Sequence, residues 1–239
     1  MISTYLWVNF LSIIIPLIFS FHPKLNFHKN FKAFFLSNII TAILFIAWDI
    51  KFTDMQVWGF NPNHLSGINI VNLPIEEVMF FFCIPFACMF TYHSLNIIFN
   101  VSWNLKIENI FVLSFSGILL FTGAYFYDKL YTSTTFISLG ILLLILKYYA
   151  KVNWLAKLAF TYPILLIPFF IVNGVLTGSW IDEPIVWYDN SENLGIRLFT
   201  IPIEDVFYGF ELIMLNIYFY ELIKVKLETM QLNKQYILQ

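Results

Sequence analysis

Seven apolar segments, each about the length of a bilayer crossing, constrain what this chain can fold into. A helix needs roughly 20 consecutive apolar residues to span a bilayer. The segments that meet this requirement are about 2–21, 31–50, 74–99, 107–127, 132–150, 155–176 and 201–223. A soluble domain does not accommodate so many, because 59% of the residues are hydrophobic and only 12% are charged. The sequence therefore predicts an all-α polytopic membrane protein with about seven transmembrane helices.

The net charge and the two cysteines argue against several kinds of functional site. The net charge of −2 argues against a nucleic-acid surface. Cys83 and Cys88 are five residues apart and do not align on a helix, so neither a disulfide nor a metal site is indicated. The first segment lacks a basic start and a small-residue cleavage site, so we expect a retained helix rather than a signal peptide.

The basic residues predict the orientation, because cytoplasmic loops carry an excess of lysine and arginine. One side receives ten of them: Lys24, Lys29, Lys32, Lys106, Lys147, Lys151, Lys157, Lys224, Lys226 and Lys234. The other side receives Lys51, Lys129 and Arg197. We therefore expect a multi-pass protein of the cell (inner) membrane, with its N-terminus outside, its C-terminus cytoplasmic, and the loops 51–73 and 177–200 outside.

The chain contains an internal duplication. LPIEEVMFFF at 73–82 returns as IPIEDVFYGF at 201–210, an offset of 128 residues. Gly67 matches Gly195 at the same offset, and Trp58 aligns with Trp187 after one gap. So long a period indicates a duplicated bundle with parallel repeats, related by an axis along the membrane normal. The predicted units are a three-helix repeat at 1–100, a linking helix at 101–130, a second three-helix repeat at 131–225 and a cytoplasmic tail at 226–239.

Acidic pairs stand at the start of two predicted helices, Glu76–Glu77 and Glu204–Asp205. Proline followed by an acid is an ordinary helix start, stabilised by roughly 0.3–1 kcal/mol through the helix dipole. The repetition of the whole Pro-Ile-Glu-acid-Val pattern favours a function instead, since one acid suffices for capping and acids near the hydrocarbon are unfavourable.

Only one acid of each pair can face the bundle centre, because adjacent helical residues point about 100° apart. Parallel repeats would bring one acid from each half to a common cleft, and we expect Glu76 and Glu204 to approach one another there. Two close carboxyls do not ionise together readily. The four catalytic candidates, which would supply a general acid and a general base, are Glu76, Glu77, Glu204 and Asp205.

Aromatic residues supply a second part of the predicted site. Tryptophans gather near the outer ends of the helices, and aromatic turns follow both acidic pairs. An interfacial belt is the alternative explanation for any single tryptophan, but together aromatic faces stabilise a carbocation. The substrate-binding candidates are Trp48, Trp58, Phe80, Trp187, Tyr208 and Glu211. Glu211 shares a helical face with Glu204, and the sequence leaves open whether it assists catalysis or is a neutral structural residue.

The doubled Pro-Ile-Glu-(Glu/Asp), the seven spans and the ending GFELIMLNIYFYE resemble the membrane-integral lycopene cyclases, here in their fused form. The resemblance covers nearly the whole chain. It implies redox-neutral cyclisation of the linear ends of lycopene to β-ionone rings, with Glu76, Glu77, Glu204 and Asp205 as site residues. It also implies lycopene or a related linear carotene, the bilayer and other carotenoid enzymes as partners. No cofactor is recognised, because the flavin fingerprint of the soluble-type cyclases is missing.

Three other functions fit parts of the pattern. A proton-coupled transporter would also show duplication and membrane acids, but it would need more small and polar residues along its helices. A retinal-type receptor would need a lysine in the middle of the seventh span, whereas the lysine nearest to this span is Lys224, at its end. A polyprenyl transferase would need metal-binding aspartates with a companion Asn-Asp pattern, which is missing both beside Asp49 and Asp54 and beside Asp182 and Asp189.

Overall fold

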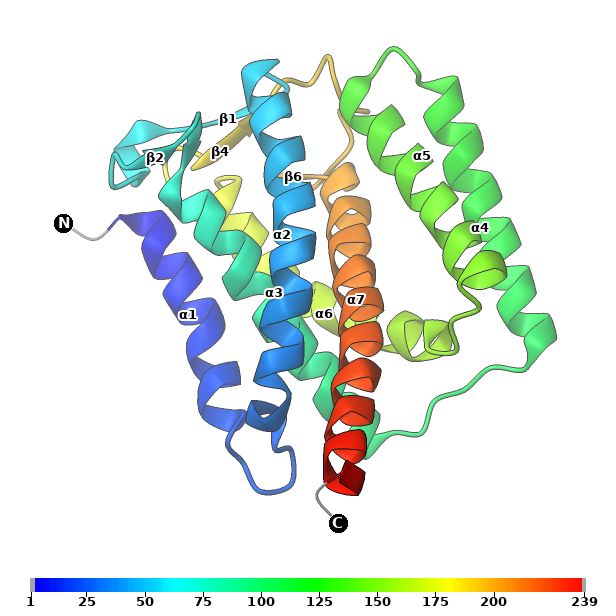
Figure 1. Ribbon diagram of the computed structural model, residues 1–239. Helices are drawn as coiled ribbons and strands as arrows, with labels where there is room; N and C mark the ends of the chain where they lie inside the picture. Colours follow the sequence, from blue (N-terminus) through cyan, green and yellow to red (C-terminus); the bar gives the residue numbers. More distant parts are fainter. Residues whose placement is uncertain (1–2, 238–239) are drawn as a thin grey trace.

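The computed structural model describes residues 3–237, and its helices follow the seven apolar segments of the sequence (Figure 1). The helices are α1 (Thr4–Phe19), α2 (Phe31–Asp54), α3 (Ile75–Ile98), α4 (Leu105–Tyr125), α5 (Leu130–Leu144), α6 (Leu155–Leu176) and α7 (Ile203–Ile237). Together with the short helical turns they make residues 3–237 72% helical, which confirms the all-α class. Short helical turns at Phe27–Asn30 and Pro62–His64 interrupt the connections, and a π-helical turn at Ile145–Tyr149 extends α5.

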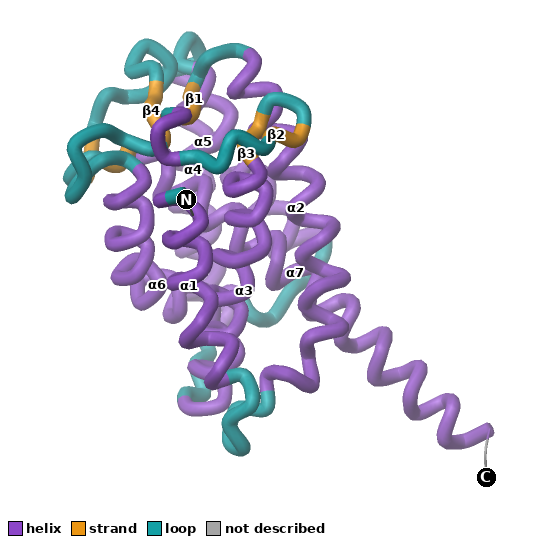
Figure 2. The backbone as a smooth tube through the Cα atoms, turned by 90° about the vertical axis from the view of Figure 1, so that its left-hand side faces the viewer, coloured by secondary structure: helices purple, strands orange, loops and turns teal. Residues whose placement is uncertain are grey.

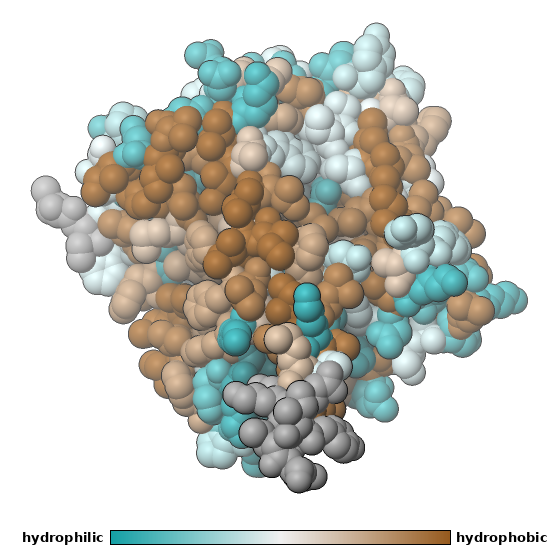
Figure 3. All heavy atoms as spheres, viewed as in Figure 1, coloured by the Kyte–Doolittle hydropathy of each residue, from teal (hydrophilic) through white to brown (hydrophobic). Residues whose placement is uncertain are grey.

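The helices have the length and composition of membrane spans. Within residues 3–237, six helical stretches are long and apolar enough to cross a bilayer, and α1, with 16 residues, is shorter. Figure 3 shows hydrophobic residues across the middle of the visible face, with hydrophilic residues gathered near its two ends. The protein is therefore a polytopic membrane protein, as its sequence predicts.

Helix α7 is longer than the sequence predicts. The predicted span ends near residue 223, whereas α7 continues to Ile237, into the segment expected to form a tail. No glycine or proline follows Gly209, so nothing in the sequence stops the helix when it leaves the apolar region. Figure 2 shows the end of α7 projecting away from the other helices.

Two matching hairpins precede the acidic helices. Strands β2 (Asn69–Ile70) and β3 (Leu73–Pro74) form one hairpin, and β5 (Arg197–Leu198) and β6 (Ile201–Pro202) form the other. The pairs Asn69–Pro74 and Arg197–Pro202 occupy the same register, 128 residues apart. Gly67 and Gly195 precede these hairpins with φ angles of +83° and +69°, which favour glycine. This shared geometry explains why the glycines recur at the repeat offset.

A third pair of strands joins the two halves at the end of the bundle that carries the hairpins (Figures 1 and 2). Strand β1 (Trp58–Phe60) pairs antiparallel with β4 (Val186–Tyr188), and Gly59 lies opposite Trp187. Equivalent strands pair antiparallel when a two-fold axis passes between them. The helix packing has the same symmetry, since α1 packs on α3 as α5 packs on α7, and α2 packs on α7 as α6 packs on α3.

Candidate active site

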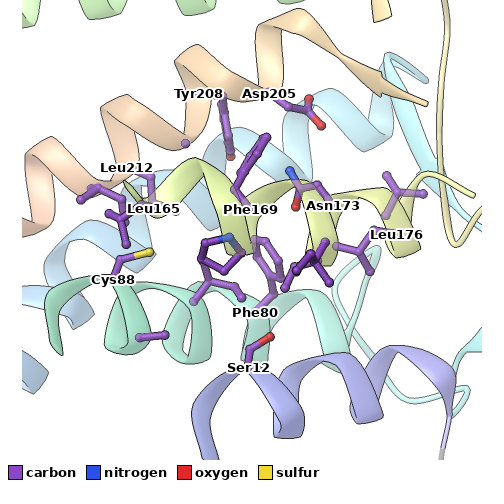
Figure 4. A pocket seen from close by; sticks show the side chains of 18 of the residues that line it. Ser12, Phe80, Cys88, Leu165, Phe169, Asn173, Leu176, Asp205, Tyr208 and Leu212 are labelled. Atoms are coloured by element: carbon purple, nitrogen blue, oxygen red, sulfur yellow. The ribbon is translucent and has the colours of Figure 1, made fainter. Parts of the chain in front are cut away.

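A cavity of about 600 Å³ lies mainly between α1, α3, α6 and α7. Figure 4 shows side chains from these four helices converging on it. Its lining runs along α3 from Glu77 to Thr91, a rise of about 21 Å. Near its mouth it is lined by lipid-facing residues of α1 and α6, namely Leu11, Ile15 and Ile171, each more than half exposed. The cavity is therefore long, mostly apolar and accessible from the bilayer.

The second acid of each repeated pair lines this cavity. Glu77 comes from the first turn of α3 and Asp205 from the first turn of α7. Both carboxyls are buried, at 8% and 5% exposure. They lie at the end of the cavity next to the strands, where the two halves of the chain meet. The structure thus brings one acid from each repeat into a common apolar space.

Tyrosine hydroxyls hold both carboxyls. Tyr5 donates to Glu77 at 2.5 Å, and Tyr131 donates to Asp205 at 2.6 Å. Tyr188 donates to the other oxygen of Asp205 at 2.9 Å. Desolvation, and then the charge of Asp205, raise the pKa of Tyr188 well above its usual value, so this phenol remains a neutral donor. Hydrogen bonds therefore hold both oxygens of Asp205 and one oxygen of Glu77 in place.

The first acid of each pair has a different environment, which corrects the expectation that Glu76 and Glu204 face one another across the cleft. Glu76 accepts hydrogen bonds from Ser3 Oγ at 2.7 Å and from the backbone N–H of Ser66 at 2.6 Å. Glu204 accepts equivalent bonds from Thr132 Oγ1 at 2.6 Å and Leu194 N at 2.8 Å. Both glutamates are fully buried, and neither lines the cavity. They anchor the loops that lead into the hairpins.

Replacing one of these anchors should destabilise the fold. Glu204→Ala leaves the Leu194 N–H and the Thr132 hydroxyl buried without their acceptor, which we expect to lower the free energy of unfolding by about 2 kcal/mol. For a chain of this size, the midpoint of thermal unfolding in detergent should then fall by about 5 °C. Asp54→Ala, in an exposed pair with Lys51, is the control and should leave the midpoint unchanged. Equal midpoints for both variants would contradict the anchoring role.

A third acid, Asp49 near the end of α2, also lines the cavity. It is 1% exposed, and its Oδ1 accepts a hydrogen bond from Trp58 Nε1. Its Oδ2 is buried and has no hydrogen-bond partner within residues 3–237. Glu76 and Glu204 also each have one buried oxygen without a partner in this part of the chain, so it is the position of Asp49 on the cavity that makes it a candidate for the site. The sequence pattern suggests Asp49 only as a candidate metal ligand of a transferase, so Asp49 is not among the predicted site residues.

Three of the six predicted substrate-binding residues line the cavity, and the other three do not. Trp58, Phe80 and Tyr208 line the cavity, and the Trp58 ring lies 6.2 Å from that of Tyr208. Trp48 does not line it, but packs edge-on against Tyr208 at 5.3 Å and borders a shallower groove between α2 and α5. The predicted aromatic residues that line the cavity therefore come from β1, α3 and α7.

Two further predicted residues lie outside the cavity lining. Trp187 packs against Gly59 and is 42% exposed, because its side chain alternates with those of Val186 and Tyr188, which line the cavity. Trp58 lies opposite Tyr188 in the sheet, so these two residues, rather than the two tryptophans, face the cavity together. Glu211 accepts a hydrogen bond from Ser138 on α5 at 2.8 Å.

Several residues that build the site are not among those predicted from the sequence, although weak signals in the sequence point to some of them. Tyr5 and Tyr131 lie 126 residues apart, close to the repeat offset, in the first turns of corresponding helices. Asp49 is an acid within a long apolar helix, a position that by itself suggests a function. No group of three or more metal-ligating side chains suited to a metal ion occurs in the part of the chain that the structure describes.

Comparison with known protein families gives a match that covers both halves of the chain. The family model described as lycopene cyclase matches residues 3–95 and 128–223, the two regions on either side of α4. The chain belongs to the lycopene cyclase family. Comparisons with curated proteins and with solved structures gave no match. Membership of this family supports a general role in carotenoid cyclisation, with a carotene as substrate and the lipid bilayer as its environment.

Proposed function

We propose that the protein is a lycopene β-cyclase that closes the linear ends of lycopene to β-ionone rings within the membrane. The observation that carries this proposal is the pair of carboxyls, Glu77 and Asp205, at one end of a long apolar cavity. An apolar polyene suits a cavity that is accessible from the bilayer, and the carboxyls supply the acid and the base that a proton-initiated cyclisation requires.

The proposed reaction begins when one carboxylic acid protonates the terminal double bond of the polyene. The resulting cation is attacked by a neighbouring double bond, which closes a six-membered ring and moves the positive charge into it. The other carboxyl, as its carboxylate, takes a proton from the ring, and a ring double bond forms. One proton is gained and one is lost, so the product is an isomer of the substrate and no net electron carrier is needed.

Aromatic rings near the carboxyls would stabilise the cation. Trp58, Tyr131 and Tyr208 form a cluster with ring centroids 5.1–6.2 Å apart, and all three line the cavity. Their π faces attract positive charge in a site from which water is largely excluded. The tyrosine hydroxyls on Glu77 and Asp205 would keep the carboxyl groups oriented through the reaction.

We further propose that the strand-bearing end of the bundle faces outward and that the C-terminus is cytoplasmic in the cell membrane. The ten basic residues on one side of the spans against three on the other support this orientation. Glu76 and Glu204 would then support the site by holding its outer loops, as their hydrogen bonds to Ser66 N and Leu194 N suggest.

Expression in a bacterial host that accumulates lycopene tests the proposed function directly. We expect pigment extracts to contain β-carotene or its one-ring precursor, with ring type identified by chromatography and NMR. A host that carries the empty vector is the control. If lycopene persists unchanged while the protein is present in the membrane fraction, the proposed function is wrong.

A further inference from the structure

The two halves of the candidate site match in backbone position, but the neighbours of the two carboxyls differ. Glu77 and Asp205 lie 128 residues apart, and each accepts a hydrogen bond from a tyrosine at the start of a neighbouring helix, Tyr5 or Tyr131. Symmetry alone would give the two carboxyls the same affinity for a proton. Glu77 and Asp205 can therefore have different roles only if residues near one of them have no counterpart near the other.

Asp49 is such a neighbour on the Glu77 side. Asp49 and Glu77 both line the cavity, at 1% and 8% exposure. The residue that corresponds to Asp49 at the repeat offset is Thr177, which lines the cavity but carries no charge. Two neighbouring carboxyls in an apolar surrounding retain at least one proton between them, because two charges there would repel one another.

Hydrogen bonds favour Glu77 as the holder of this proton. Asp49 Oδ1 accepts from Trp58 Nε1, and Thr53 Oγ1 lies 3.5 Å from the same oxygen. Donors of this kind favour the ionised form of Asp49. Oε1 of Glu77, by contrast, has no hydrogen-bond partner in the described part of the chain, and Glu77 lines the cavity. The proton is thus held on an oxygen that an alkene in the cavity can reach.

Arg197 is the corresponding neighbour on the Asp205 side. Its guanidinium lies 5.7 Å from the centre of the Tyr188 ring, and Tyr188 donates to Asp205. The positive charge of Arg197 acts on Asp205, and both oxygens of Asp205 accept hydrogen bonds from phenols. At the repeat offset Arg197 corresponds to the uncharged Asn69. These neighbours favour the ionised form of Asp205.

We propose that Asp49 and Arg197 break the two-fold symmetry of the site, so that Glu77 is the carboxylic acid that donates the proton and Asp205 is the carboxylate that accepts it. This assignment rests on the proposed function. Asp49 and Arg197 act through the two reacting carboxyls and are positioning residues. The other titratable groups around Glu77 are Tyr5 from α1, Tyr188 from β4, and Asp205 and Tyr208 from α7.

Infrared spectroscopy of the purified protein in lipid vesicles tests the proton assignment without turnover. At neutral pH the wild-type spectrum should contain a carboxylic-acid C=O band that shifts in D₂O and disappears in Glu77→Gln. The pH at which this band is lost should fall in Asp49→Asn and stay near the wild-type value in Asp49→Glu. It should also stay unchanged in Asp54→Asn, an exposed position on the same helix. Arg197→Gln should instead raise the pH at which a second carboxylic-acid band, the one that Asp205→Asn removes, is lost.

The infrared spectra can overturn the assignment of Glu77 as the proton donor and Asp205 as the acceptor. An unchanged pH for the loss of the Glu77 band in Asp49→Asn, or a wild-type spectrum without a band that Glu77→Gln removes, would overturn it. If Asp49→Asn does not accumulate in the membrane, the Arg197→Gln spectra decide, and an unshifted Asp205 band would then overturn the proposal. Failure of the proposed function would be seen separately, as unchanged lycopene in the expression host.

Discussion

Glu77→Gln and Asp205→Asn are each expected to lower ring formation at least a hundredfold, which is about the smallest contribution of a general acid or base. Each change replaces a carboxyl at the end of the cavity with an amide of the same shape that neither donates nor accepts the required proton. The amide oxygen still accepts a hydrogen bond from Tyr5 or Tyr131, so the fold should persist. Ring formation is measured as the fraction of cyclised pigment in the lycopene-accumulating host, at matched amounts of membrane protein.

Glu76→Gln and Glu204→Gln distinguish this site from the one expected from sequence. Each of these variants retains a carbonyl oxygen that can accept the N–H of Ser66 or Leu194, so partial activity should remain. Complete loss of activity in Glu76→Gln, together with full activity in Glu77→Gln, would assign catalysis to the first acid of the pair and contradict the arrangement proposed here.

Ala87→Trp is expected to lower the rate constant kcat/KM for lycopene by at least about tenfold, which corresponds to about 1.4 kcal/mol. Ala87 lines the cavity ten residues after Glu77, about 15 Å further along α3. An indole there would occupy the space in which we expect the polyene to lie, while the carboxyls remain unchanged. The measurement is the initial rate of ring formation with lycopene in lipid vesicles.

A matched control separates blocked binding from a general effect of a large residue in the membrane. Leu113→Trp places the same side chain on a lipid-facing position of α4, where Leu113 is 56% exposed, and should leave the rate unchanged. A shorter acyclic substrate with the same end group should be less affected by Ala87→Trp than lycopene is. An unchanged rate with lycopene would show that the polyene does not occupy this part of the cavity.

Much of the fold could be predicted because its determinants are local in the chain. The predicted spans 74–99 and 155–176 correspond closely to α3 (Ile75–Ile98) and α6 (Leu155–Leu176), since the length of an apolar segment is set by the bilayer it crosses. The short strands were not predicted. Their pairing depends on hairpins and on contacts across the two halves of the chain, which leave little pattern in segments of two or three residues.

The site was predicted less completely than the fold. The acidic pairs could be found because the whole Pro-Ile-Glu-acid-Val pattern recurs, but the orientation of each acid depends on how the helix is rotated against its neighbours. A rotation of about 100° separates Glu76 from Glu77, and it decides which one lines the cavity. The phenols and Asp49 come from helices distant in sequence, so only packing reveals them as neighbours of the acids.

The sequence by itself determined that this protein is a duplicated bundle of membrane helices with an acidic pair at the start of one helix in each half. These features follow from hydropathy and from repetition, which are properties of the chain before it folds. The tertiary structure alone decided that Glu77 and Asp205 share one cavity, while Glu76 and Glu204 anchor loops. The physical reason is that burial, hydrogen bonding and electric fields depend on distances between groups that only folding brings together.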